Sequence, residues 1–239
     1  DNSEHGISEA ELESMPLSEA LTNIVHENAR VRFHAAIAIG DSDSAEATEA
    51  LTNLALGDFH DPWMRKAILS GAEKRAGQIL QAVIRIEGFA DTASPERLAF
   101  VREFSQAVGR RKDAQEIAAV QGAIAKTPHW LQLAVYEGLG RSAKLSAEEW
   151  EIKVTLALAE QAEMADRLAA IRLTQYLPPD RGVYFLRALI SSGQPPEIRA
   201  AAFDIAPRLN RAKVSELLFS SWPEMKRDSK AKALAILAK

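Results

Sequence analysis

The sequence predicts an all-α fold in which about seven helix pairs stack into a right-handed superhelix, with residues 1–239 forming one repeat domain. Three observations lead to this prediction. Segments with the alternating pattern of a β-strand are nearly absent. Apolar residues instead recur at the spacing of a helix with one buried face, as in Leu98, Val101, Phe104, Ala107 and Val108. Finally, a capped helix that carries an arginine returns about every 33 residues, a period typical of helical solenoids.

The composition indicates a folded, soluble chain without cysteine chemistry. Of its 239 residues 47% are hydrophobic, and Gly and Pro number only 12 and 10, which excludes disorder and low complexity. The absence of Cys excludes disulfides, thiolate metal sites, iron–sulfur clusters, covalently attached c-type haem and cysteine nucleophiles. The net charge of −4 provides no general attraction to nucleic acid or to membranes. No apolar run approaches the length of about 20 residues that spans a bilayer, so no membrane insertion is expected.

Helix start signals are frequent along the chain. Asp61-Pro62, Ser94-Pro95 and Thr127-Pro128 each place a capping side chain before a proline in the first helical position, where the missing N–H is not needed. Segments 8–11 and 146–149 have the spacing of a capping box, in which Ser and Glu satisfy two backbone N–H groups reciprocally. Each of these five signals predicts the start of a helix.

Stop signals follow the starts. Gly40-Asp41, Gly109-Arg110, Gly140-Arg141 and Pro178-Pro179 predict helix ends, because glycine accepts the left-handed conformation of a C-terminal cap and proline cannot continue a helix. Starts and stops together predict helices of roughly 10–16 residues joined by short turns.

The repeat consists of a capping residue, two spacers, an apolar residue and an arginine, followed by an alanine-containing stretch. Segments 28–35 and 61–68 show it most clearly, 195–202 has proline in the capping position, and 165–170 is a looser copy. The marker positions are Arg32, Arg65, Arg102, Leu131, Arg167, Arg199 and Lys232. An irregular helical bundle with arginines spaced by chance is the competing interpretation.

Each interval between two markers leaves room for one further helix. The predicted helices cover residues 45–56, 77–86, 114–124, 147–161, 182–191 and 213–221. Segments 8–14 and 228–239 are expected to cap the two ends of the stack. In the second segment four apolar residues would face a missing neighbour and promote dimerisation, namely Ala231, Leu234, Ala235 and Leu237.

This cap-x-x-apolar-Arg-x-x-Ala pattern resembles HEAT repeats over nearly the whole chain, and the resemblance implies an armadillo-like α-solenoid. In HEAT repeats the arginine lies on the second, inner helix and commonly pairs with the acidic cap of an adjacent repeat. The resemblance therefore implies that Asp61 pairs with Arg32 or Arg65. The expected structural ladder comprises Arg32, Asp61, Arg65, Arg102, Arg167 and Arg199. Leu131 departs from the pattern, and Pro207 is expected to kink or end its helix.

A narrower likeness concerns segments 61–70, 104–111 and 136–140. They are similar to the HEAT segment of large haem-binding, dehydrogenase-like proteins of planctomycete-type bacteria, which carry a C-x-x-C-H haem site. The likeness implies that this chain is the connecting scaffold of such a protein, excised from a longer chain and extracytoplasmic (periplasmic) in location. The chain itself has no Cys and hence no such haem site.

No constellation of catalytic or metal-ligating residues is recognisable. The five histidines include no pair three or four positions apart, the spacing of a two-histidine metal site on a helix. A nucleophile elbow, a Walker A loop and a G-x-G-x-x-G fingerprint are absent. The sequence therefore predicts no enzymatic activity, no catalytic residue, no metal and no cofactor.

The tryptophans are the more informative residues. Trp63 and Trp130 both fall in the first turn of a helix that opens with proline. They are predicted either to pack that turn against the next repeat or to form an aromatic ridge for a partner, which makes Trp63, Arg65 and Trp130 candidate binding residues. Trp150 and Trp222 fit core or end-cap positions.

The predicted function is that of a non-enzymatic scaffold whose concave surface, built from the second helices, binds a protein or another domain of the parent chain. The alternative is an alkylpurine DNA glycosylase or another nucleic-acid-binding solenoid, which needs a strongly cationic concave face. Acidic segments 41–49 and 148–151 interrupt such a face, and basic cluster 110–112 fits a helix end. No nucleic-acid partner is therefore expected. Duplex DNA binding with a steep salt dependence would distinguish the alternative.

Overall fold

The computed structural model describes residues 15–40 and 42–238, and this part of the chain is all-α. No β-strand occurs among the described residues, which confirms the predicted fold class at that level. The predicted N-terminal cap, residues 8–14, lies outside the described residues, as does Asp41 of the first stop signal. No helix within the described ranges has the length and apolarity that crossing a membrane requires.

The chain divides into two compact units, unit 1 with residues 1–131 and unit 2 with residues 132–239. Helix α9 (His129–Leu139) contains the boundary. Each unit has its own buried core, so each is described by itself.

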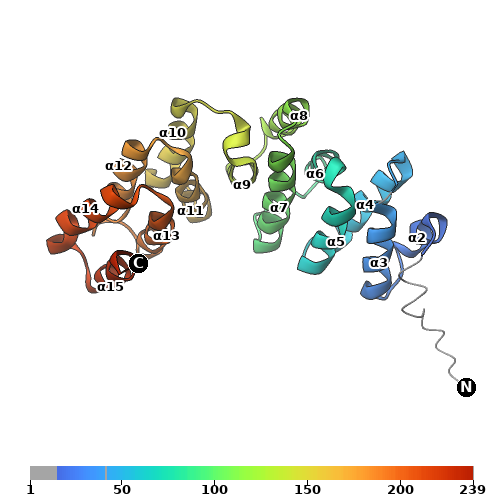
Figure 1. The fold of residues 1–239 in the computed structure, drawn as a ribbon, viewed down its shortest axis with the longest axis horizontal. Coiled ribbons are helices and arrows are strands. Elements are labelled where there is room, and N and C mark those ends of the chain that lie inside the picture. The colour runs from blue at the N-terminus through green and yellow to red at the C-terminus, as the bar shows by residue number, and fades with distance from the viewer. Residues whose placement is uncertain (1–14, 41, 239) are drawn as a thin grey trace, which may run out of the picture. The chain divides into compact units, whose positions relative to one another are not determined.

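Unit 1 contains two rows of helices. Helices α3, α5 and α7 pack side by side, and α4, α6 and α8 form the second row (Figure 1). Every second helix is thus a neighbour, as expected when one helix pair stacks on the next. The helices are α2 (Leu17–Asn23), α3 (Ala29–Gly40), α4 (Ala45–Asp58), α5 (Pro62–Ala72), η1 (Glu73–Arg75), α6 (Ala76–Ile84), α7 (Pro95–Arg111) and α8 (Ala114–Ile124).

Helices α3 and α5 approach each other most closely at two glycines. A Cβ atom built on Gly40 would lie 2.2 Å from the Cα of Gly71, and one built on Gly71 would lie 2.3 Å from the Cα of Gly40. Carbon atoms in contact are normally about 3.5–4.0 Å apart. Only glycine at both positions therefore permits this crossing.

Unit 2 repeats the same kind of packing. Helix α11 packs on α13 and α13 on α15, while α12 packs on α14. Short 3₁₀ turns end several of these helices. The elements are η2 (Gly140–Ala143), α10 (Ala147–Thr155), η3 (Leu156–Leu158), α11 (Met164–Leu173), η4 (Thr174–Tyr176), α12 (Pro179–Leu189), α13 (Pro196–Ile205), η5 (Ala206–Arg208), α14 (Arg211–Ser221), η6 (Trp222–Glu224) and α15 (Arg227–Leu237).

Three of the local start signals act as predicted, whereas α9 begins at His129, one residue after the proline of the Thr127-Pro128 signal. The Asp61 carboxylate accepts from the Trp63 N–H at 2.8 Å, and the Ser94 hydroxyl caps α7. Ser146 forms a complete capping box with Glu149. The helices predicted between the markers are all present, and α8 has the predicted bounds. Helix α13 ends at Ile205, two residues before Pro207, as the missing proline N–H requires.

Two stop signals were interpreted wrongly. Gly109 is buried inside α7, which continues to Arg111 and ends at Lys112 in the left-handed conformation, with φ +58°. The Pro178-Pro179 pair begins α12 instead of ending a helix, because Pro179 occupies its first position and Pro178 the cap. A glycine or a proline alone therefore does not show whether a helix ends, continues or begins at that position, because the packing around it also decides.

Candidate functional site

Arg32 joins the α2–α3 turn to the end of α4. Its Nε and one terminal nitrogen donate to both carboxylate oxygens of Asp58, at 2.7 and 2.9 Å. The other terminal nitrogen donates to the backbone oxygens of His26 and Glu27, at 2.8 and 2.9 Å. The hydrogen bond that Arg32 donates to Asp58 raises the pKa of Arg32 above its ordinary value. All three guanidinium nitrogens are thus used for structure.

Arg65 occupies the equivalent position on α5. It donates to both carboxylate oxygens of Glu103 on α7, at 2.9 and 3.1 Å, and to the backbone oxygen of Phe59 at 2.8 Å. Its side chain is buried, whereas that of Glu103 is about one-third exposed. Arg65 therefore ties the turn before its own helix to the next helix of the same row.

Unit 2 contains two further arginines of this kind. Arg167 donates to the backbone oxygen of Ala157 at 3.1 Å and to the side chain of Gln194 at 2.9 Å. Arg199 donates to the backbone oxygen of Gln194 and, at 3.1 Å, to the carboxylate of Asp228 on α15. This contact lowers the pKa of Asp228 below its usual range. In both units the arginine bonds to the preceding turn and to a side chain of the next helix pair.

The acidic partner predicted for this ladder was wrong. Asp61 does not pair with Arg32 or Arg65, because its carboxylate is used as the cap of α5. Asp58, three residues earlier, takes the place opposite Arg32, and Glu103 takes that opposite Arg65. Arg102 on α7 is half-buried and also has interaction partners.

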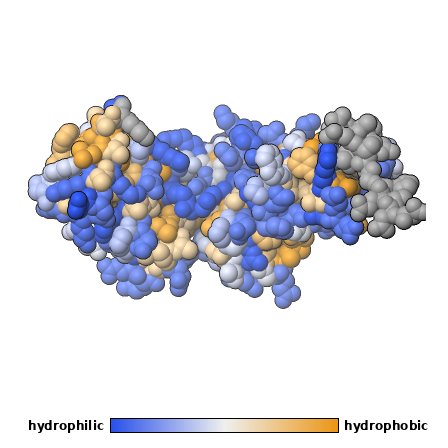
Figure 2. All heavy atoms as spheres, turned by 90° about the horizontal axis from the view of Figure 1, so that it is seen from below, coloured by the Kyte–Doolittle hydropathy of each residue, from blue (hydrophilic) through white to orange (hydrophobic). Residues whose placement is uncertain are grey.

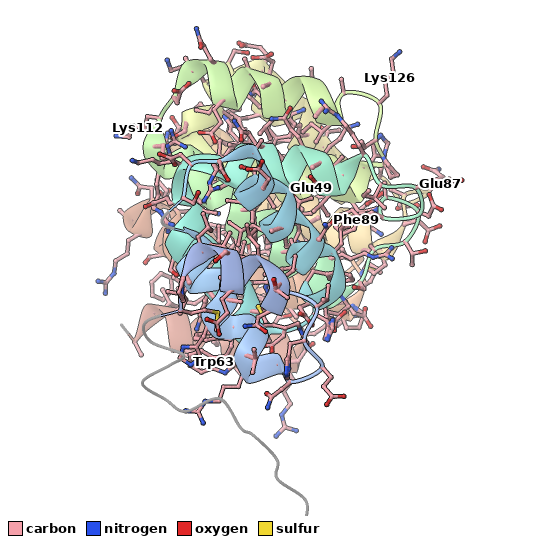
Figure 3. All side chains as sticks on the ribbon, turned by 90° about the vertical axis from the view of Figure 1, so that its right-hand side faces the viewer. Glu49, Trp63, Glu87, Phe89, Lys112 and Lys126 are labelled. Atoms are coloured by element: carbon pink, nitrogen blue, oxygen red, sulfur yellow. The ribbon has the colours of Figure 1, made fainter. Side chains whose placement is uncertain are left out.

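The two candidate tryptophans differ in how deeply they are buried. Trp130 is only 6% exposed, and its indole N–H donates to the backbone oxygen of Ala90 at 3.0 Å, which makes it a structural residue. Trp63 is 67% exposed, with the Lys66 ammonium 4.6 Å from the ring centroid (Figure 3). The aromatic ridge therefore does not form from this pair, and Trp63 alone offers a surface contact.

Unit 2 exposes large apolar side chains that sequence reasoning missed. They include Ile152 on α10, Tyr184 on α12 and Phe219 on α14. Ion pairs link the same helices, Glu151 with Arg181 and Asp180 with Lys213. The sequence contains only a weak signal for their exposure. Each residue falls outside the buried stripe of its helix, but that stripe is defined by which neighbouring helices pack against it.

A groove lies at the C-terminal end of unit 2. It has a volume of about 450 Å³ and is lined by α13, η5, α14 and α15. Its lining is mainly apolar, with Phe203, Pro207 and Ile236, and the Asp204–Lys232 ion pair lies along it. Hydrophobic surface is visible at this end of the chain in Figure 2. Leu234 and Ala235, predicted to face a missing neighbour, are exposed.

Titratable groups are scattered. Within residues 15–40 and 42–238, no three His, Asp or Glu side chains gather as metal ligands would. One partly buried carboxylate belongs to Glu116, which accepts from the Gly77 N–H at 3.1 Å and lies 3.3 Å from Arg111. Burial raises its pKa. These contacts join the start of α6 to α8, so we assign Glu116 a structural role.

Comparisons with known proteins give no family. No protein-family model matches the sequence, and no curated protein matches it. The described helices are compatible with a helical repeat solenoid.

Proposed function

We propose that this chain is a non-enzymatic, HEAT-like repeat scaffold that binds protein. The helices from α2 to α15 can be grouped as seven successive pairs, and the marker positions all fall on the second helix of a pair. Within each unit the second helices pack on one another, which supports the stacking of helix pairs that the proposed right-handed superhelix requires. Four marker arginines each form two kinds of hydrogen bond. One goes to a backbone oxygen of the preceding turn, and the other goes to a side chain of the next helix pair.

The observation that carries the binding role is the exposure of Trp63. Trp63 lies on a second helix and is 67% exposed as a residue, so it keeps a large apolar area in water. Tryptophan is enriched among the residues that dominate binding energy at protein interfaces. The proposed contact surface therefore includes Trp63 and Lys66 on the solvent side of α5.

We expect a photo-reactive p-benzoylphenylalanine at position 63 to cross-link a protein in the cells that make this chain. The matched control places the same residue at position 122 on α8, where a Cβ atom would meet nothing. Cross-linked species are identified by mass spectrometry. Equal cross-linking from both positions, or none from position 63, would reject Trp63 as a contact.

We propose that the partner is a domain of the same polypeptide, as the haem-protein likeness implies. The native gene product should then have an intact mass well above 26.2 kDa and a c-type haem absorption spectrum. A native mass near that of this chain, without haem absorption, would contradict the proposed parentage and leave a free-standing scaffold.

A further inference from the structure

Unit 2 contains a small aromatic pocket between η2, the start of α10 and the turn before α12. Its volume is about 240 Å³, enough for roughly eight water molecules at about 30 Å³ each. Three polar side chains, two leucines, an alanine and two prolines line it. They are Arg141, Leu145, Ala147, Trp150, Tyr176, Leu177, Pro178 and Pro179.

The aromatic wall of this pocket is held in place by unit 2 itself. The rings of Trp150 and Tyr176 are tilted by 34° to each other with centroids 4.9 Å apart, and the Tyr136 ring packs edge-on with Trp150 at 6.1 Å. The Tyr176 hydroxyl donates to the backbone oxygen of Glu137 at 3.0 Å. At Gly140 the chain has φ +54°, and a Cβ atom there would lie 3.2 Å from the Tyr176 hydroxyl. The wall is thus formed before any ligand arrives.

The pocket offers hydrogen-bond donors that no described residue uses. Trp150 lines the pocket and is only 4% exposed, and its indole N–H donates to no described residue. Arg141 is exposed, and its guanidinium pairs with no described carboxylate. The side chains that line the pocket include no carboxylate and no amide. The pocket therefore combines hydrogen-bond donors that lack an acceptor with a wall of aromatic and proline rings.

We propose that this pocket binds a proline of an extended, proline-containing peptide segment that carries an acidic residue beside it. Proline is the residue that brings a carbonyl acceptor without an N–H of its own, which complements a pocket with spare donors. Its ring fits against tryptophan, tyrosine and proline, as in aromatic-lined grooves for polyproline helices. The Trp150 N–H donates to the peptide carbonyl, and Arg141 pairs with the acidic side chain.

This inference rests on the proposed function, since it names the kind of protein segment that the scaffold recognises. It concerns a different surface from Trp63, so the two can fail separately. Cross-linking at position 63 without peptide binding would reject the pocket alone. Peptide binding without cross-linking would reject only the Trp63 surface.

The test uses the ¹⁵N-labelled chain and a short acetylated peptide of prolines followed by glutamates. Four tryptophans give four indole N–H signals, and Trp150→Phe assigns the one in the pocket. We expect the peptide to shift this signal and to leave that of buried Trp130 in place. A matched peptide with alanines in place of the prolines should leave all four signals unchanged. No shift at millimolar proline peptide, or equal shifts with the alanine peptide, would overturn the proposal.

Two variants test the donors. Arg141→Ala should weaken binding of the proline–glutamate peptide about threefold to fivefold, the upper part of the range of an exposed ion pair. It should not weaken binding of a proline–lysine peptide. Trp150→Phe keeps an aromatic ring but removes the indole N–H. It should weaken the binding of both peptides about fivefold, because one hydrogen bond is lost. Arg187→Ala, an exposed arginine of unit 2 outside the pocket, is the matched control. Equal affinities in Arg141→Ala and Arg187→Ala would contradict the assignment of Arg141.

Discussion

Gly71→Ala is expected to destabilise unit 1 by about 3 kcal/mol or more, the upper range of overpacking effects. The added methyl group would lie 2.3 Å from the Cα atom of Gly40, and the obstacle is backbone, which no rotamer change can move. Helices α3 and α5 would have to separate by more than 1 Å, about the shortfall from normal carbon contact, and lose their close packing. Urea unfolding followed by circular dichroism measures the effect, and hydrogen exchange locates it in unit 1.

The matched control is Gly122→Ala. Gly122 lies within α8, and a Cβ atom there meets nothing within 4 Å. Alanine is favoured over glycine inside a helix by about 1 kcal/mol, so this variant should be as stable as the parent or slightly more stable. If Gly71→Ala and Gly122→Ala unfolded at the same urea concentration, the close crossing of α3 and α5 would be refuted.

Arg65→Ala is expected to lower the free energy of unfolding by about 2–3 kcal/mol. Breaking a buried ion pair typically costs about 3–5 kcal/mol, because the remaining charge loses its partner. Glu103 is about one-third exposed and regains water, which places the effect at or below the lower limit of that range. The backbone oxygen of Phe59 also loses its charged donor. Chemical denaturation of the variant measures the loss.

Arg110→Ala provides the control for charge alone. Arg110 lies 3.7 Å from Glu73, and both side chains are more than half exposed, so its removal should change the stability by less than about 0.5 kcal/mol. Arg65→Lys should fall between the two, because lysine keeps the charge but cannot bond to both carboxylate oxygens in the same way. If Arg65→Ala and Arg110→Ala unfolded at the same denaturant midpoint, the arginine ladder would be shown not to stabilise the fold.

The helices and their caps could be predicted because their causes are local. The Asp61 cap and the Ser146 capping box involve residues two or three positions apart, and hydrophobic periodicity is a property of a single helix. The arginine positions could be found for the same reason, since each belongs to a motif of eight consecutive residues. The partners of these arginines could not, because Asp58 lies 26 residues from Arg32 and Glu103 lies 38 residues from Arg65.

The tryptophans show where local sequence stops being informative. Trp63 and Trp130 have almost the same setting, the first turn of a helix that follows a proline. By itself the sequence determined the all-α class, the order of the helices, their caps and the recurring arginine. Only the tertiary structure decided that Trp130 is buried, with its N–H on Ala90, while Trp63 stays in water. The same holds for the pocket of Trp150 and Tyr176, because burial depends on which distant turn packs over a side chain, and short-range patterns do not encode that turn.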